Sequence, residues 1–313
     1  MTDRVIAPPD PRTTVKAFVS VSPFSYPALD EQVDGPPASI VENLLSRHVG
    51  RPFALTNSGR HALDLILADL SLPKTAVVTI LTTSGSDYVS NCVTSIIERY
   101  CRWSMRIEED TAAIIAIHEW GRACERVSDH LGRGVPIIED CAYAFATRYA
   151  DGEPVGRRGD YALFSLTKMF SVNFGGLALA PGNRVLNYDM PAEDRNFLLR
   201  RIGPELSSLQ VVLAEREKVW RALSSLFSKL GATPFFQEVA GEVPSVYMFH
   251  HSPEQVPLAD VRRRFEDHGI EASVFYGSNA VFVPAHHRVG PSTRSLMFEI
   301  YRKLLIEHGQ LVR

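Results

Sequence analysis

A lysine at the end of a buried strand is the first residue of this sequence that could do chemistry. The apolar run Tyr161–Leu166 predicts a strand, and it ends at Thr167 and Lys168, ahead of Gly175-Gly176 and a second apolar run. Burying an unpaired ammonium group costs several kcal/mol or more, so such a lysine should pair or react. A partly desolvated lysine has a lowered pKa and can form a Schiff base as a nucleophile. The alternative, more common for a lone lysine, is a surface side chain that keeps its charge in water.

A short turn nearer the start of the chain could hold a phosphate group. Asn57-Ser58-Gly59 comes directly before an apolar helical pattern. The free N–H groups and the positive end of that helix would attract an anion, and Arg60 could add a guanidinium group. The alternative is a simple N-cap with a tight turn, and for the turn taken alone this alternative is favoured.

An acid and an aromatic residue complete the set of candidate site residues. Asp140 ends the apolar run that starts at Val135, where a carboxylate could face a cationic ring nitrogen or could cap the next loop. Tyr88 could stack on a planar cofactor, or simply pack a helix. Pyridoxal phosphate needs a helix N-terminus for its phosphate, an acid for its ring nitrogen and a lysine for its aldehyde. The order phosphate turn, aromatic, acid and lysine before Gly-Gly therefore indicates a pyridoxal phosphate site.

The predicted elements would bring these residues to one edge of a sheet. Short apolar runs that alternate with helical patterns are typical of a parallel sheet covered on both faces, and ligands bind at the carboxyl ends of its strands. His118, Asp140 and Lys168 follow such runs. The predicted strands are 76–81, 112–118, 135–140 and 161–166. The predicted helices are 40–49, 59–70, 86–101 and 122–133. Ser86 or Asp87 is the expected N-cap of the third helix. One amphipathic helix is expected over 205–230, followed by a strand (243–251), a helix (258–270) and a strand (271–277) of a smaller α+β unit.

Composition excludes several classes of protein. The net charge is −3, with acids and bases spread along the chain, so we expect no nucleic-acid and no membrane-surface partner. No apolar run reaches the ~20 residues that span a bilayer, and residues 1–15 lack a signal-peptide pattern, so a cytoplasmic location is expected. Four dispersed cysteines suggest reduced thiols. The adjacent pairs His250-His251 and His286-His287 would point to opposite strand faces, so no metal site is expected.

With these segments in order, the chain resembles the DegT/StrS aminotransferases, fold-type I pyridoxal phosphate enzymes that mostly act on keto-sugar nucleotides or aminocyclitol precursors. The matching segments are "ALTNSGRHALDLILADL", "DYVSNCV", "IIAIHEWG", "VPIIEDCAYAFATRYADGEPVGRRGDYALFS", "TKMFSVNFGGLAL" and, more faintly, "FEDHGIEASVFY". The resemblance implies an α/β, aspartate aminotransferase-like large domain with a mostly parallel sheet and a smaller C-terminal α+β domain. It implies an irregular segment (1–36), a cofactor-binding large domain (37–204), a connecting helix (205–230) and a small domain (231–313).

The resemblance also assigns roles to single residues. Lys168 would form the internal aldimine and then move the proton, while Asp140 would pair with the pyridine nitrogen. His118 would lie in the family's "HxxG" turn as a structural residue. The implied cofactor-binding residues are Ser58, Gly59, Arg60, Tyr88, Asp140, Tyr143, Ser165 and Lys168. The implied partners are a small-molecule ketone and an amino donor, glutamate or glutamine, in a homodimer with shared active sites.

Departures from the family pattern leave two alternatives open. Arg60 replaces a usual Thr, Tyr143 replaces a usual Gln or His, and the Ser165–Lys168 spacing is three residues instead of five. No Asn matches the one that the partner subunit usually contributes. The first hypothesis is an aminotransferase. The second is another pyridoxal phosphate reaction (elimination, dehydration or substitution), and the third is a non-catalytic homologue.

Overall fold

The computed structural model describes residues 19–25, 35–251, 256–275 and 277–311. Most of the segment predicted to be irregular, 1–18 and 26–34, lies outside the described residues, as does Tyr276 of a predicted strand. Within the described part of the chain, no helix is both long and apolar enough to cross a bilayer.

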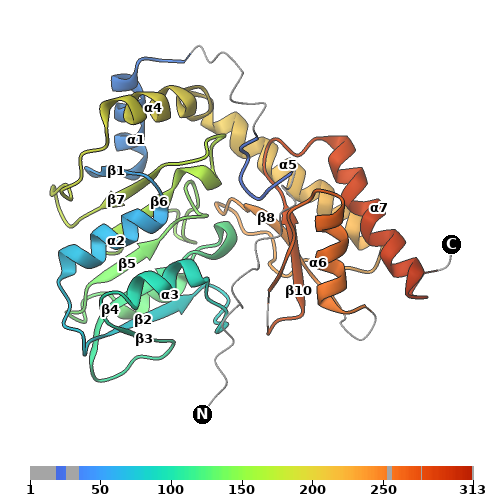
Figure 1. Cartoon of the computed structure of the whole chain (residues 1–313), viewed down its shortest axis with the longest axis horizontal. Helices are drawn as coiled ribbons and strands as arrows, with labels where there is room; N and C mark the ends of the chain where they lie inside the picture. Colours follow the sequence, from blue (N-terminus) through green and yellow to red (C-terminus); the bar gives the residue numbers. More distant parts are fainter. Residues whose placement is uncertain (1–18, 26–34, 252–255, 276, 312–313) are drawn as a thin grey trace.

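A seven-stranded mixed sheet forms the centre of the larger unit (Figure 1). Its strand order is β1-β7-β6-β5-β4-β2-β3, in which β3, β2, β4, β5 and β6 are parallel and β7 runs antiparallel to both β6 and β1. The strands are β1 (Ala54–Thr56), β2 (Val77–Thr82), β3 (Arg102–Ser104), β4 (Thr111–Ile117), β5 (Ile137–Asp140), β6 (Tyr161–Ser165) and β7 (Gly176–Leu179). The predicted mostly parallel sheet is confirmed, and β4, β5 and β6 end at the same edge, beside His118, Asp140 and Ser165.

Apolar side chains of alternating strand positions pack on the two faces of this sheet. Val78 and Ile80 contribute to a core with α2 and α3, while Phe164 packs in a second core with α1 and α4 on the other face. The helices are α1 (Ala38–Val49), α2 (Gly59–Leu70), α3 (Asn91–Ile97) and α4 (Ala192–Ser207).

Two predicted helices are shorter than the sequence suggested. The helix expected over 86–101 is α3 alone, and its N-cap is Ser90 instead of Ser86 or Asp87. The Ser90 hydroxyl accepts a hydrogen bond from the Cys92 N–H. The Ser86 carbonyl, in the preceding loop, accepts one from the Thr82 hydroxyl. The helix expected over 122–133 is a 3-10 segment over Glu125–His130. The Cys124 N–H, just before this segment, donates to the His118 ring, and left-handed Gly132 follows it.

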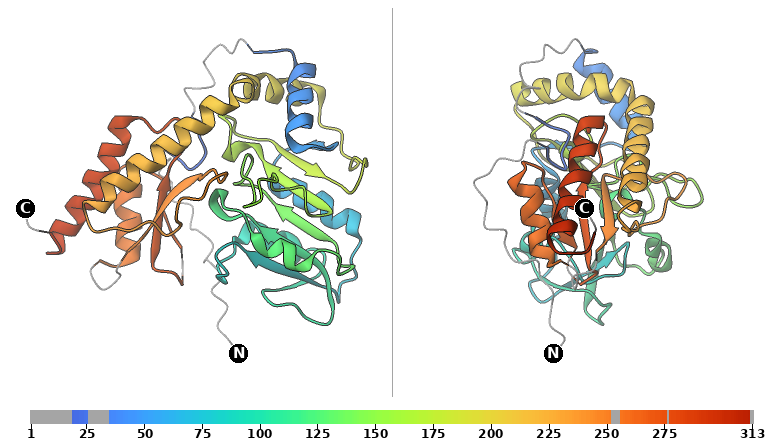
Figure 2. Two further views of the ribbon diagram at one scale, coloured as in Figure 1. Left: turned by 180° about the vertical axis from the view of Figure 1, so that it is seen from behind. Right: turned by 90° about the vertical axis from the view of Figure 1, so that its right-hand side faces the viewer.

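A smaller unit follows a long connecting helix (Figures 1 and 2). The predicted helix over 205–230 is α5 (Leu209–Ser228), and residues 205–207 belong to the end of α4. Beyond it, a three-stranded antiparallel sheet of order β8-β10-β9 packs with two helices. These elements are β8 (Val246–His250), α6 (Leu258–Asp267), β9 (Ser273–Phe275), β10 (Ala280–Pro284) and α7 (Pro291–Glu307). The sequence predicted β8, α6 and β9 but not β10 and α7.

Residues near the N-terminus return to this junction between the units. Val19 forms a parallel bridge with Ile270, the Val21 N–H donates to Glu271, and the Ser22 hydroxyl donates to the Thr167 carbonyl. The segment 19–25 therefore lies against both the small unit and the turn that carries Lys168.

Candidate active site

A cavity of about 450 Å³ opens at the carboxyl edge of the large sheet. It is lined by all eight residues that the sequence assigned to cofactor binding: Ser58, Gly59, Arg60, Tyr88, Asp140, Tyr143, Ser165 and Lys168. The other lining residues are Leu63, Val89, Ser90, Cys92, Val93, Ile117, His118, Glu119, Trp120, Ala142 and Leu163. Four separate segments of the chain thus bring together the residues that sequence patterns singled out.

The first turn of α2 forms one end of the cavity. The Ser58 hydroxyl accepts from the His61 N–H at 3.1 Å, so the N-cap interpretation is confirmed alongside the placement in the cavity. The Arg60 guanidinium donates to the Cys92 thiol at 2.7 Å, across the cavity lining. A β-carbon on Gly59 would lie 3.1 Å from that of Ser165, which brings the two residues into one cradle.

Gly176, at the start of β7, lets the backbone of this turn approach closely. A β-carbon there would lie 2.6 Å from the Ser58 carbonyl carbon and 2.8 Å from the Gly59 nitrogen, so Gly176→Ala must push the turn away. We expect this substitution to destabilise the protein by roughly 1–3 kcal/mol, the usual cost of overpacking, and to weaken pyridoxal phosphate binding at least tenfold. Thermal unfolding and a fluorescence titration with pyridoxal phosphate would check both. Gly290→Ala, where no atom lies within 4 Å of the new β-carbon and the backbone has φ −70, is the control for glycine loss.

Asp140 brings a buried carboxyl group to the cavity. Its Oδ1 accepts from the Ala142 N–H at 2.9 Å, and no cationic side chain of the described residues forms an ion pair with it. Burial raises the pKa of Asp140, because the ionised form loses its water without gaining a full charge partner. A cation in the cavity next to Asp140 would therefore be stabilised, which is what a protonated ring nitrogen offers.

Lys168 ends the 3-10 turn Leu166–Lys168 that follows β6. Its Nζ lies 5.1 Å from the centroid of the Tyr143 ring. The pKa of Lys168 is raised by Tyr143, against the effect of burial, and the Glu271 charge adds to the rise. The lowered pKa expected from the sequence is therefore wrong, because Tyr143 and Glu271 come from other elements and surround the amine with groups that favour its charged form. Burial in turn raises the pKa of the Tyr143 phenol.

Aromatic rings form the wall of the cavity that faces the small unit. Tyr88 packs edge-on against Phe275 of β9 with ring centroids 4.8 Å apart. Trp120 contacts both Tyr143 and Phe282 of β10, with centroids 4.7 and 4.3 Å apart. The small unit thus supports the rings that would lie over a planar ligand.

Two residues that sequence reasoning missed lie beside His118. Trp120 has a left-handed backbone (φ 56), and its indole N–H is buried with no hydrogen-bond partner among the described residues. Burial raises the pKa of Glu119 to about 7, while its carboxylate accepts from the Ser84 N–H at 2.7 Å. The left-handed backbone of Trp120 is strained, and only the surrounding structure can hold such a conformation in place. Strained backbone of this kind is frequent at functional sites. The signal was the "HEWG" turn itself, in which only His118 was considered.

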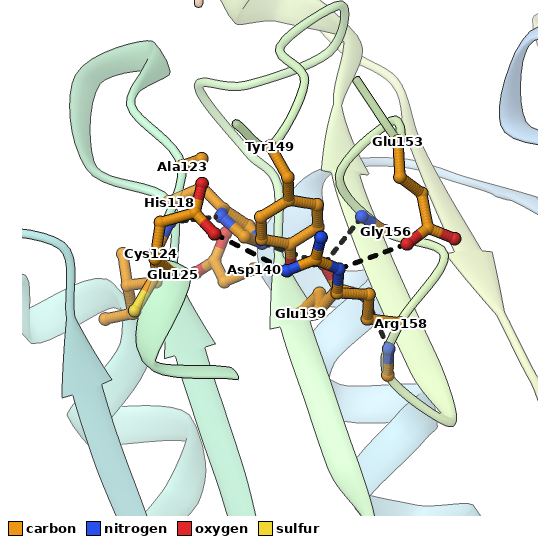
Figure 3. Close-up of polar contacts among 12 residues, drawn as sticks. His118, Ala123, Cys124, Glu125, Glu139, Asp140, Tyr149, Glu153, Gly156 and Arg158 are labelled. Atoms are coloured by element: carbon orange, nitrogen blue, oxygen red, sulfur yellow. Dashed lines mark hydrogen bonds and ion pairs between the residues drawn. The ribbon is translucent and has the colours of Figure 1, made fainter. Parts of the chain in front are cut away.

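Glu139, the neighbour of Asp140, is the centre of a buried hydrogen-bond network (Figure 3). Its carboxylate accepts from His118 Nε2, the Tyr149 hydroxyl and the N–H groups of Gly156 and Gly159. The other His118 ring nitrogen accepts from the Cys124 N–H, which supports the structural role given to His118. His118, Glu139 and Cys141 have possible metal-ligand atoms within 4.8 Å of one another. The Glu139 carboxylate, however, is already occupied by its four hydrogen-bond donors. The network holds the backbone that aims Asp140.

Replacing Glu139 by glutamine should destabilise the protein by roughly 3–5 kcal/mol, the usual cost of breaking a buried charged network. Although burial opposes ionisation, the hydrogen bonds from His118, Gly159 and Tyr149 lower the pKa of Glu139 from 4.5 to about 2. A depressed acid stabilises the fold above its unfolded pKa, and this contribution is lost as the pH falls from about 4.5 towards 2. Urea unfolding at pH 7 and pH 3 would check both points: the wild type should lose stability on acidification, and the variant should lose less. Equal losses would contradict the role of the ionised carboxylate.

Comparisons with known proteins bear on the family resemblance and on the fold. The model of the DegT/DnrJ/EryC1/StrS aminotransferase family matches residues 102–184, which contain Asp140, Tyr143, Ser165 and Lys168. No curated protein sequence matches the chain significantly.

Solved structures share the fold at low sequence identity. The aminotransferase TlmJ from Streptoalloteichus hindustanus is 16% identical, with a TM-score of 0.70 over 90% of this chain and 93% of that one. The PLP form of Spr1654 from Streptococcus pneumoniae is 16% identical (TM-score 0.68, 88% and 93% covered), and Helicobacter pylori PseC is 13% identical (TM-score 0.68, 90% and 95% covered). These likenesses confirm the fold type I architecture. Together with the match over 102–184, they confirm the resemblance noted from the sequence to the DegT/DnrJ/EryC1/StrS aminotransferases, whose family model matches that segment of the chain.

Proposed function

We propose that this protein uses pyridoxal phosphate to transfer an amino group from a donor, glutamate or glutamine, to the carbonyl carbon of a ketone. The observation that carries the proposal is that Lys168, Asp140 and the N-terminus of α2 line one cavity. Spr1654, whose fold is similar, has been solved in a PLP form and a PMP form.

The residues of the cavity fit this cofactor. The α2 turn (Ser58–Arg60) and Ser165 would hold the phosphate, since the first turn of a helix leaves N–H groups free for an anion. Tyr88 would cover the ring face, and Tyr143 would lie near the ring hydroxyl. Asp140 would face the ring nitrogen, where its uncompensated charge favours a proton. Lys168 would hold the aldehyde carbon.

The bound cofactor supplies an aldehyde that bonds to amines and an electron-poor ring that stabilises negative charge on the neighbouring carbon. Asp140 would keep the ring nitrogen protonated. The Lys168 Nζ would move a proton, as a general base and then as a general acid. The raised pKa of Lys168 in the cofactor-free protein means that its ammonium group must first lose a proton to water, because burial raises the pKa of the neighbouring Tyr143 phenol and keeps that group protonated.

The ketone is proposed to be a keto-sugar or a related biosynthetic intermediate. The aromatic faces of Tyr88, Trp120 and Tyr143 suit the flat C–H face of a sugar-like ring. Among the described lining residues, Arg60 is the one cation besides Lys168. Two other arginines of the large unit are already engaged: Arg158 pairs with Glu125, Asp151 and Glu153, and Arg157 donates to the His48 carbonyl. A nucleotide part of the substrate would therefore lie outside this cavity.

A homodimer in the cytoplasm is proposed as the working form. Ile40 of α1, Phe197 of α4 and Val211 of α5 are exposed apolar side chains at 48%, 40% and 65% of their surface, and a second copy would cover them. All four cysteines are free thiols, which fits a reducing compartment. Sedimentation velocity of the purified protein would give the oligomeric state.

A half-reaction tests the proposed function directly. Protein loaded with pyridoxal phosphate is mixed with single amino acids, and released pyridoxamine phosphate is measured by chromatography. Stoichiometric conversion by at least one donor is the expected result. Bound cofactor with no conversion by any amino acid would favour elimination or substitution chemistry, and failure to bind pyridoxal phosphate would favour the non-catalytic homologue.

A further inference from the structure

The turn that carries Lys168 is held by side chains from two distant parts of the chain. Three successive carbonyl groups at the end of this turn each accept a hydrogen bond from a side chain. The Thr167 carbonyl accepts from the Ser22 hydroxyl at 2.6 Å, and the Lys168 and Met169 carbonyls accept from Arg216 Nη2 at 2.9 and 3.0 Å. Carbonyl groups at the end of a helical turn have no partner within the turn, so these bonds fix its direction.

Arg216 is an unusual residue to bury for this purpose. It lies on α5 and is 1% exposed, and none of the described carboxylates forms an ion pair with it. Its Nε has no hydrogen-bond partner among the described residues, and burial lowers its pKa to about 10. Burying a cation costs several kcal/mol, and an apolar side chain would usually be as good or better for stability. A guanidinium group here gains two carbonyl bonds to the lysine turn and, without an ion pair, the attraction of the Glu205 carboxylate.

The position of the turn matters because Lys168 must meet the cofactor with its Nζ. The ammonium group lies at the end of a flexible four-carbon side chain, next to Tyr143. A displacement of about 1 Å between reacting groups can cost on the order of 100-fold in rate. Ser22 is itself fixed by its neighbour Val21, whose N–H donates to Glu271 at 2.7 Å.

We propose that Arg216, assisted by Ser22, is a positioning residue that holds the Lys168 turn so that the amine meets the cofactor aldehyde. The inference rests on the proposed function, and it adds that α5 and the segment 19–25 set the reactivity of a lysine on the large sheet.

Arg51 offers a closely matched control. Its guanidinium also donates to backbone carbonyls only, those of Gly156, Gly159 and Asp160, and its Nε also lacks a partner among the described residues. These carbonyls belong to the loop before β6, and Arg51 does not line the cavity. Arg51→Met should therefore remove a comparable set of bonds to backbone carbonyls, without acting on the lysine turn.

The experiment measures how fast cofactor-free protein attaches pyridoxal phosphate to Lys168. Borohydride stops the reaction at set times, and mass spectrometry quantifies the modified Lys168 peptide. We expect Arg216→Met to attach at least tenfold more slowly than Arg51→Met at equal thermal stability, Ser22→Ala to be slowed less, and Arg216→Lys to recover part of the rate. Equal rates for Arg216→Met and Arg51→Met would overturn the proposal. If Arg216→Met does not fold, wild-type rates in both Arg216→Lys and Ser22→Ala would overturn it.

A second measurement separates this proposal from the proposed function. Hydrogen exchange of the cofactor-free proteins should be faster in peptides covering residues 166–172 for Arg216→Met than for Arg51→Met, whether or not cofactor binds. Unchanged exchange there would sink the positioning role alone. A wild type that attaches no pyridoxal phosphate would overturn the proposed function, and with it the role of the turn in attachment.

Discussion

Replacing Lys168 by alanine is expected to abolish covalent retention of pyridoxal phosphate and to lower the rate of amino transfer at least about 1,000-fold. Two functions are lost together, because the same amine is proposed to hold the cofactor and to move the proton. General acid–base catalysis alone contributes on the order of 10²–10⁴ in rate. Intact mass after borohydride treatment measures retention, and single-turnover reaction with glutamate or glutamine measures transfer.

The controls for this prediction come from the same protein. Lys218 on α5 is exposed and pairs with Glu215, so Lys218→Ala should retain the cofactor as the wild type does. A cofactor mass found on Lys168→Ala would mean that a different lysine reacts. Retention lost with transfer unchanged would contradict proton transfer by Lys168 while leaving its binding role intact.

The candidate site could be predicted largely because its parts stand in local sequence patterns. Ser58 and Gly59 precede an apolar helix, and Asp140 and Lys168 follow apolar strands. Parallel strands bring their carboxyl ends to one edge of a sheet, so Asp140 and Lys168, 28 positions apart in the sequence, line one cavity. The cavity therefore followed from the order of elements without knowledge of any contact.

What the sequence could not predict depends on contacts between distant segments. Arg216 lies 48 residues from Lys168, on a helix whose other charges are mostly exposed, and Ser22 lies 145 residues from Thr167. A single arginine in an amphipathic helix is usually a solvated charge, and only the packing of α5 shows otherwise. The expected lowering of the Lys168 pKa was wrong for the same reason, because the groups that raise this pKa come from other elements.

The secondary structure missed near the chain's end has a related cause. Strand β10 lies in the middle of the small sheet and is buried throughout, but its short apolar run ends in Pro284, a residue that argues against a central strand. The helix expected at 122–133 had apolar residues at helical spacing, but a backbone N–H at its start binds the His118 ring instead. At that helix a tertiary contact outweighed the local pattern.

Replacing Asp140 by asparagine is expected to raise the stability of the cofactor-free protein and to reduce activity. The buried carboxyl has a pKa raised by burial and gains only the Ala142 N–H, a bond that the asparagine oxygen can keep. Removing an uncompensated buried charge should raise the midpoint of thermal unfolding by roughly 1–2 °C, the shift that about 1 kcal/mol produces in a chain of 313 residues. Activity should fall at least about 100-fold, as when one charge-stabilising group is removed.

The pH dependence gives this prediction its sharpest form. An acid whose folded pKa is raised stabilises the fold below its unfolded pKa, and that contribution is lost as the pH rises through the folded value. The gain from Asp140→Asn should therefore appear at neutral pH and shrink as the pH falls through the range where Asp140 becomes protonated. Calorimetry of cofactor-free wild type and variant from pH 4 to pH 8 measures it. Saturating pyridoxal phosphate should reverse the order at neutral pH, because the protonated ring nitrogen then partners the carboxylate of the wild type. A variant that stays the more stable protein with the cofactor bound would show that Asp140 does not face that nitrogen.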